Sequence, residues 1–264
     1  MPTPLSVYIL THNSERRLAE VLDAATEIAD EIIVVDSGSS DSTEEILKRY
    51  PVHLLHRTFD NFRDQRIFAE SACSNAWVLA IDSDEVLSSE LIDEIRKLKE
   101  NDFLSAGGQQ PDGFEIRRDW YFLNRQVRNF YPVRTPEFIV RLFQKDKIST
   151  KGSRIIHEAL QVDGCNIGTI RAPIKHYSCD SIDDLYGKIG LYTRLMAEDM
   201  HAKGERASWV KIHLYPWLIW GQWYFLRGSW RDGEAGIVLS RYVRITVYLK
   251  YLKLKFMAVA KPGQ

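Results

Sequence analysis

The chain has 264 residues, of which 45% are hydrophobic and 27% are charged, enough for one large domain with an appended element. Its formal net charge of -1 excludes a protein that binds nucleic acid through overall positive charge, and no nucleic-acid partner is expected. Three cysteines without metal-type spacing predict a reducing compartment and no disulfide framework. The first residues contain no basic segment followed by an apolar one, so we expect no signal peptide and a cytoplasmic location.

The first hundred residues alternate between apolar runs of strand length and segments with helical spacing. The apolar runs are residues 5–10, 32–36, 52–56 and 77–81, and the helical segments are 18–25, 44–49 and 62–73. Strands that alternate with helices, two of them continuously apolar and ending in Asp, predict an α/β fold with a Rossmann-like, mainly parallel sheet flanked by helices. Neither G-x-G-x-x-G nor the P-loop pattern follows the first strand, which disfavours dinucleotide enzymes and P-loop NTPases.

Three carboxylates, Asp82, Asp84 and Glu85, follow the apolar run 77–81. They are expected at the carboxyl end of a strand, the edge where open α/β sheets bind ligands. Asp82 and Asp84 are two residues apart, so on an extended strand end their side chains point the same way. With nothing basic next to them, they indicate a divalent cation that carries a diphosphate, since Mg²⁺ binds through one or two carboxylates plus substrate phosphates. The alternative is a solvated turn before a helix capped by Ser88 or Ser89.

Three further polar positions each have two interpretations. Asp36 at the end of the second strand suits a ligand for ribose hydroxyls or a base N–H, and equally the cap of the helix that begins near Asp41. Glu158, in the pair His157-Glu158, suits a general base, which contributes about 10²–10⁴-fold, whereas such a pair is more often structural. His176 suits a third metal ligand through neutral imidazole, although a hydrogen-bonded buried histidine is the commoner case.

The middle of the chain changes character. Residues 101–113 are rich in Gly, Gln and Pro and predict a loop, while residues 114–118 and 138–143 alternate like strands. Between these strands, residues 120–136 contain many Tyr, Phe, Asn and Arg side chains. That composition suits a sugar or lipid-headgroup acceptor, or else an ordinary small aromatic core.

The tail is helical, aromatic and basic. Residues 181–203 have helical spacing, and five of the seven tryptophans fall between residues 209 and 230. Charged residues and a proline interrupt the segment, so no spanning helix is expected. Because Trp and Tyr favour the membrane interface and Lys and Arg favour an anionic leaflet, we expect amphipathic helices over residues 209–256 on the inner face of the cytoplasmic membrane. The alternative is that these helices pack on the rest of the chain or form a dimer.

Three blocks in this order resemble the inverting family-2 glycosyltransferases of GT-A fold. They are VYILTHNSE at 7–15, IIVVDSGSSDST at 32–43 and WVLAIDSDE at 77–85. The chain is most similar to the branch of bacterial lipopolysaccharide inner-core β-glucosyltransferases, which also shows the blocks at 141–143, 157–158 and 176–178 and an aromatic, basic tail. The resemblance covers nearly the whole chain. It implies a GT-A catalytic domain over 1–180, with a nucleotide-sugar-binding half at 1–100 and an acceptor half at 101–180, and a helical membrane-associating region over 181–264.

The resemblance also implies roles for individual residues. The nucleotide-sugar-binding positions that it implies are Thr11, Glu15, Asp36, Arg66, Asp82, Ser83 and Asp84. Asp82-Ser83-Asp84 matches the family's DxD motif, with Asp82 toward the ribose and Asp84 on Mg²⁺ or Mn²⁺, and His176 is a weaker metal candidate. Glu158 falls at the position of the catalytic carboxylate. Ile67, where relatives usually have Asn, and the missing second glycine near residues 61–64 alter the expected donor contacts rather than the fold.

These roles imply metal-dependent, inverting transfer of a hexose, with glucose as the first expectation, from a UDP-sugar to a lipid-linked or lipopolysaccharide core glycan. Two other classes fit part of the pattern. A sugar-phosphate nucleotidyltransferase also uses strand-end acids and Mg²⁺, but it usually has a glycine-rich basic loop after its first strand, and residues 11–17 contain no glycine. A non-catalytic, membrane-bound sugar-nucleotide-binding scaffold is the other class. The sequence predicts no oligomeric state.

Overall fold

The computed structural model describes residues 2–105, 108–150, 160, 162–187 and 189–257. The chain divides into two compact units. The first consists of Met1–Asp119 and Glu137–His176, and the second of Trp120–Pro136 and Tyr177–Gln264. The aromatic segment between the two alternating strands therefore belongs to the same unit as the helical tail.

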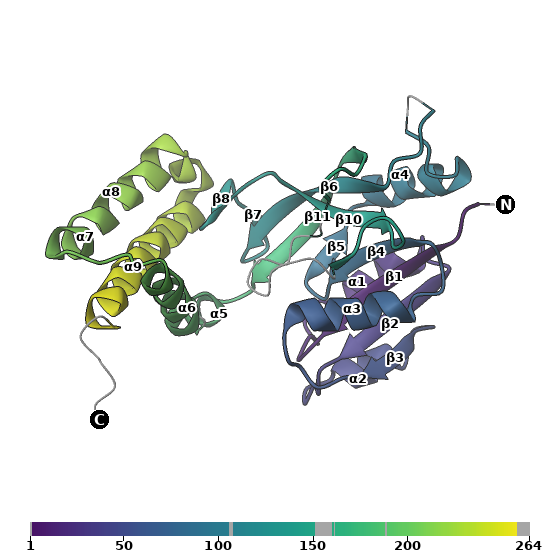
Figure 1. The fold of residues 1–264 in the computed structure, drawn as a ribbon, viewed down its shortest axis with the longest axis horizontal. Coiled ribbons are helices and arrows are strands. Elements are labelled where there is room, and N and C mark those ends of the chain that lie inside the picture. Colours follow the sequence, from purple (N-terminus) through teal and green to yellow (C-terminus); the bar gives the residue numbers. More distant parts are fainter. Residues whose placement is uncertain (1, 106–107, 151–159, 161, 188, 258–264) are drawn as a thin grey trace. The chain divides into compact units, whose positions relative to one another are not determined.

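The first unit is built on a mixed sheet with the strand order β3-β2-β1-β4-β10-β6-β11-β5 (Figure 1). Its strands are β1 (Leu5–Thr11), β2 (Glu31–Asp36), β3 (His53–His56), β4 (Trp77–Asp82), β5 (Glu85–Leu87), β6 (Gly113–Phe122), β10 (Glu137–Gln144) and β11 (Ile167–Cys179). The four strands β3, β2, β1 and β4 run parallel, whereas β10 pairs antiparallel with β4 and β6, and β11 pairs antiparallel with β5. The predicted α/β class, with a parallel sheet flanked by helices, is confirmed.

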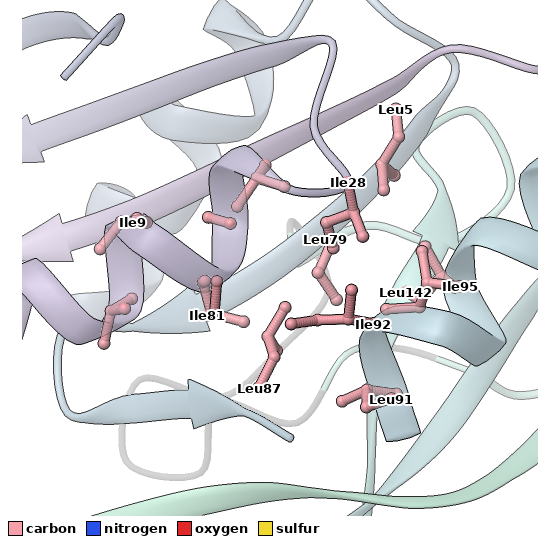
Figure 2. Close-up of a cluster of buried hydrophobic side chains, with 14 of the residues drawn as sticks. Leu5, Ile9, Ile28, Leu79, Ile81, Leu87, Leu91, Ile92, Ile95 and Leu142 are labelled. Atoms are coloured by element: carbon pink, nitrogen blue, oxygen red, sulfur yellow. The ribbon is translucent and has the colours of Figure 1, made fainter. Parts of the chain in front are cut away.

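Both faces of the parallel strands are covered because these strands are apolar on both sides. The helices of this unit are α1 (Leu18–Thr26), α2 (Thr43–Leu47), α3 (Phe62–Ala72) and α4 (Ser89–Glu100). One face packs against α1 and α4, where Ile9, Leu79 and Ile81 meet Leu91 and Ile95 in one buried cluster (Figure 2). On the other face, Tyr8, Val35 and Ala80 pack with Ala69 of α3. Burial on both faces fixes the strand register and so the position of every strand end.

The strand register brings three polar residues to one edge of the sheet. Thr11 at the end of β1 pairs with Asp36 at the end of β2, and Leu10 pairs with Asp82 at the end of β4. Since parallel strands end at the same edge, these groups form a row across β2, β1 and β4. The helix expected after the acidic cluster is α4, and Ser88 caps it by accepting a hydrogen bond from the Leu91 amide at 3.2 Å.

The second unit is mainly helical. It contains β7 (Arg125–Gln126), β8 (Asn129–Phe130), β9 (Val133–Arg134), α5 (Ile182–Gly187), α6 (Ile189–Ala202), α7 (Trp209–His213), α8 (Tyr215–Gly221), the π-helical turn η2 (Gln222–Leu226), the 3-10 turn η3 (Ser229–Asp232) and α9 (Gly233–Met257). Its core has two clusters, both built on α9. One of them contains Trp120 stacked on Phe130, with ring centroids 4.9 Å apart. Of the helices in the described ranges, none is both long and apolar enough to cross a membrane.

Candidate active site

The carboxyl end of β2 forms the first half of the candidate site. The Asp36 carboxylate is fully buried and accepts four hydrogen bonds from uncharged donors. Thr11 Oγ1 and Ser39 Oγ donate to Oδ1 at 2.9 and 2.6 Å, and the Gly38 and Ser39 amides donate to Oδ2 at 2.9 Å each. Gly38 has a φ of 84°, the left-handed region that glycine adopts without strain, at the turn where its amide donates to Asp36.

These hydrogen bonds decide what Asp36 does in the folded chain. Burial alone raises the pKa of Asp36, but the hydrogen bonds from Ser39, Thr11 and Gly38 outweigh that effect and lower it, so the group is an anion. It does not cap α2, because the Thr43 amide at the start of that helix donates to Asp41 Oδ1 at 3.0 Å. Four donors fill the lone pairs of a carboxylate, so Asp36 has no free acceptor position while the Thr11 and Ser39 hydroxyls keep these bonds.

Glu15 lies in the loop after β1 and binds the loop after β2. Its carboxylate Oε2 accepts from the Ser42 amide at 3.0 Å, and its own amide donates to Asp41 Oδ2 at 3.1 Å. The Ser14 hydroxyl lies 2.8 Å from the hydroxyl of Ser83, which belongs to the turn after β4. The two candidate residues Glu15 and Ser83 therefore sit on loops that hydrogen bonds hold beside Asp36 and Asp82.

The end of β4 forms the second half of the candidate site, and three arginines from other elements surround it. Arg66 Nη2 of α3 donates to Asp82 Oδ1 at 2.7 Å, and Arg141 Nη2 of β10 donates to Asp82 Oδ2 at 2.7 Å. The same Arg141 atom lies 2.7 Å from Glu85 Oε1, which also accepts from Arg118 Nη1 at 2.9 Å. We refer to these five residues as the guanidinium cluster.

The guanidinium cluster keeps its carboxylates charged. Burial alone raises the pKa of Asp82, but the positive charges of Arg141 and Arg66 outweigh it and hold that pKa well below its usual range. Burial of Glu85 is likewise outweighed by Arg141 and Arg118, so its pKa is lowered although its side chain is 0% exposed. Buried charges of this kind persist because each one is paired and hydrogen-bonded.

Two expectations about the acidic cluster are wrong. The carboxylates do not lack basic neighbours, because α3, β6 and β10 bring arginines from distant parts of the sequence to Asp82 and Glu85. The chain is also not extended through Asp84, since residues 83–84 form a turn between β4 and β5. Asp84 consequently has a different neighbour from Asp82: its Oδ1 lies 3.4 Å from His176 Nδ1 on β11.

Asp84 fits a metal-binding role better than Asp82, and the role of His176 as a metal ligand stays a prediction. The Asp84 side chain is 42% exposed, whereas both oxygens of Asp82 already bind arginines. Burial lowers the pKa of His176, but the charge and hydrogen bond of Asp84 outweigh this and raise it. A partly exposed carboxyl group is the type of ligand that a hard cation takes, and His176 lies beside it.

Three more groups of residues bear on the candidate site: a second set of possible cation ligands, Glu158, and the arginines that pair with the acids. Asp36, Glu44 and His56 lie close enough to share a cation, but the four hydrogen bonds to Asp36 occupy its carboxylate. Glu158 lies outside the described residues, so its predicted role as the base stays a prediction. Sequence reasoning missed Arg118 and Arg141 as partners of the acids; a signal was present, since Arg141 interrupts the apolar pattern of residues 138–143.

Comparisons with known proteins agree with this architecture. Residues 6–161 match the profile of Glycosyl transferase family 2. An uncharacterised glycosyltransferase of Rickettsia typhi is 30% identical over 97% of this chain and 88% of its own length. The lipopolysaccharide core biosynthesis glycosyltransferase LpsC of Rhizobium meliloti is 26% identical over 95% of this chain and 92% of its own.

Solved structures extend the comparison to the fold. A mycobacterial protein shares it with a TM-score of 0.51 at 14% identity, covering 74% of each chain. A glucosyl-3-phosphoglycerate synthase of Mycobacterium tuberculosis, solved with Mg²⁺ and UDP, has a TM-score of 0.49 at 17% identity over 78% of this chain and 81% of that one. The family match over more than half of the chain, together with full-length relatives, shows that this protein is a glycosyltransferase and belongs to glycosyl transferase family 2.

Proposed function

We propose that this protein transfers a hexose from a UDP-sugar to a lipid-linked or lipopolysaccharide core glycan, with inversion at the anomeric carbon and with glucose as the first donor to test. The observation that carries the proposal is the row of groups at one sheet edge, where Asp36 and Asp82 end strands on either side of β1. Such an edge is where α/β folds bind nucleotides. The name of the Rhizobium relative supports the acceptor class.

The donor nucleotide is proposed to bind between the two strand ends. Thr11 and Asp36, with Glu15 on the adjoining loop, take the uridine, and the Thr11 and Ser39 hydroxyls exchange their bonds to Asp36 for bonds to the ligand. Arg66 and Asp82 face the ribose and diphosphate as an ion pair rather than as isolated charges. The pair positions the donor through hydrogen bonds while its own charges remain balanced.

Asp84 and Ser83, in the turn after β4, are assigned to the diphosphate. A divalent cation bound at Asp84, Mg²⁺ or Mn²⁺, supplies positive charge beside the phosphates when it is present. Asp84 holds that charge at the leaving-group side, and His176 orients the Asp84 carboxylate through the contact at 3.4 Å. Arg141 holds Asp82 and Glu85, the residues directly before and after the turn.

The chemical step is a single displacement. Glu158 removes the proton from the acceptor hydroxyl, whose oxygen forms a bond to the anomeric carbon as the bond from that carbon to the diphosphate oxygen breaks. UDP leaves with the electron pair of that bond, and the proton stays on Glu158. One displacement on an α-linked donor gives a β-linked product.

The first test is UDP release from a panel of UDP-sugars, with Mn²⁺ or with chelator, for the native protein, Asp84→Ala and the control Asp93→Ala on the exposed face of α4. We expect metal-dependent release from one donor, lost in Asp84→Ala and kept in Asp93→Ala. Metal-dependent UDP binding that survives in Asp84→Ala contradicts the role of Asp84. UDP binding without turnover on any lipid-linked acceptor supports the scaffold alternative, and release of diphosphate supports the nucleotidyltransferase.

The base is tested separately. Glu158→Gln keeps the size of the side chain and removes its basicity, so transfer should fall by about 10²–10⁴-fold while UDP affinity stays nearly unchanged. Isothermal titration with UDP and a transfer assay on the same preparation measure the two quantities. Unchanged turnover removes Glu158 from this role.

A further inference from the structure

One segment of the second unit combines positive charge with exposed apolar surface. Residues 206–231 contain Arg206, Lys211, Arg227 and Arg231 and no Asp or Glu. They include α7, α8, η2 and the first three residues of η3, whose last residue, Asp232, forms an ion pair with Arg128. The same segment holds nine of the large apolar side chains that are exposed to solvent in the described structure, namely Trp209, Val210, Leu214, Tyr215, Trp217, Leu218, Phe225, Leu226 and Trp230.

These apolar side chains lie on the outer face of the helices. Ile212, Pro216 and Trp223 are buried at helical spacing, and Ile212 and Trp223 pack with Val243 and Val247 of α9. The exposed residues at 210, 214, 217–218 and 225 follow the same spacing, displaced to the opposite side. Leu218 is 66% exposed and Leu226 is 83% exposed. The segment is thus apolar on both faces, and one of them has no covering in the described structure.

Helix α9 behaves differently, although the sequence suggested one membrane-facing region over 209–256. Two of its three lysines make bonds inside the unit: Lys253 Nζ donates to the Gly190 carbonyl and to Thr193 Oγ1 at 2.7 Å each, and Lys250 Nζ lies 3.4 Å from the Tyr131 hydroxyl. Burial lowers the pKa of Lys250, which marks a group withdrawn from water. Helix α9 therefore packs beneath α7 and α8, and the exposed apolar face is formed by residues 209–230.

The positive charge of this segment favours an anionic partner over a second copy of the same segment. Two copies of the protein meeting through this face bring like charges together, since residues 206–231 contain cations and no Asp or Glu to pair with them, which disfavours a dimer. An anionic lipid surface is complementary to the same charges. Tryptophan side chains also favour the headgroup region of a membrane. Two guanidinium groups already lie over exposed indole rings, Arg231 over Trp230 at 5.2 Å and Arg244 over Trp217 at 4.1 Å. Each pair holds a cation next to an apolar ring. At a membrane surface the cation can contact the headgroup phosphates while the ring contacts the acyl chains just below them.

We propose that residues 209–230 form a membrane-docking face that seats in the interface of an anionic bilayer. The exposed apolar side chains enter the boundary between headgroups and acyl chains, and Arg231 and Arg244, which lie over the exposed rings of Trp230 and Trp217, meet the headgroup phosphates. The docking face rests on the proposed function in one respect, because a lipid-linked acceptor is embedded in a membrane.

The test is flotation of the full chain with phosphatidylcholine vesicles prepared with and without phosphatidylglycerol. The native protein should float with the anionic vesicles and lose binding as salt rises. Leu218→Asp combined with Leu226→Asp should weaken binding by roughly tenfold or more, since two buried apolar contacts become charges. The matched control is Leu191→Asp combined with Leu195→Asp on α6, where both leucines are 47% exposed; it should float like the native protein.

Three readouts separate the possible failures. Equal binding of both double variants, or equal loss in both, overturns the proposal. Light scattering that shows a native dimer broken by Leu218→Asp with Leu226→Asp, without vesicle binding, assigns the face to a second copy and also overturns it. UDP release in solution should be equal in all these proteins, so a silent enzyme that still floats with anionic vesicles refutes the proposed function and not the docking face.

Discussion

Two strand ends of this protein look alike in sequence and differ in the fold. Strands β2 and β4 are both continuous apolar runs that end in Asp, on either side of β1. Asp36 at the first end is held by hydroxyls and amides, whereas Asp82 at the second is held by two guanidinium groups. One carboxylate is stabilised by dipoles and the other by charges, although the local pattern is the same.

The difference follows from which elements reach each strand end. The Asp36 donors come from Thr11 opposite it and from the loop directly after β2, so they are close in sequence or register. The Asp82 partners come from α3 and β10, which stand 16 and 59 residues away. The Thr11 and Ser39 hydroxyls can leave Asp36 by rotating about one bond. Arg66 and Arg141 are packed in the interior, which restricts the rotation of their side chains. The Asp36 end is suited to exchanging partners with a ligand, and the Asp82 end is suited to holding its position.

The largest effect is expected at the centre of the guanidinium cluster. Glu85→Ala leaves Arg118 and Arg141 facing a buried gap, and removing one partner of a buried ion pair costs about 3–5 kcal/mol of unfolding free energy. Glu137→Ala is the matched control, because Glu137 also binds Arg118 but its side chain is 26% exposed, and its loss should cost about 1 kcal/mol. Urea unfolding measures both. Equal losses in the two variants contradict a buried charge cluster.

The next effect compares the two strand ends directly, with Asp82→Asn against Asp36→Asn. At Asp82, whose side chain is 28% exposed, the –NH₂ group of the new amide faces one arginine whichever way it is turned, so a charge-assisted hydrogen bond is lost at a cost of about 1.5–3 kcal/mol. At Asp36 the amide can face the Thr11 and Ser39 hydroxyls, which rotate to accept from it, and the loss should be about 1 kcal/mol. Unfolding curves of both variants decide the order, and a larger loss at Asp36 contradicts the distinction between dipoles and charges.

The sequence predicted what depends on local pattern and missed what depends on distant partners. Apolar runs located β1, β2, β4 and their ends, and alternation located β6 and β10, because burial dictates those patterns. The turn at residues 83–84 and the short strand β5 were missed, since three residues carry too little pattern to show a strand. The arginine partners of Asp82 were missed because pairing across a sheet is set by topology. The same limit applies to Lys250 and Lys253, whose partners lie on other elements of the second unit.

The smallest effect is a dependence on pH that separates the same two carboxylates. Both native pKa values are lowered, for Asp82 by Arg141 and Arg66 against burial and for Asp36 by its hydrogen bonds against burial, and the lowering is greater at Asp82. A carboxyl group with a lowered native pKa stabilises the fold above its unfolded pKa, and this contribution is lost as the pH falls through the native value. The stability differences between native protein and each Asn variant should therefore shrink on acidification.

That shrinkage should be about 0.3 kcal/mol by about pH 4, where the unfolded carboxyl group is about half protonated, and should then grow by up to about 1.4 kcal/mol per pH unit. It should stop earlier for Asp36→Asn, once the pH passes the native pKa of Asp36, and continue to lower pH for Asp82→Asn. Urea unfolding of the three proteins across the acid range measures both curves. Curves that level off together would mean that guanidinium charges and neutral hydrogen bonds hold the two strand-end anions equally well, and the exchange of partners proposed for Asp36 would then need another cause.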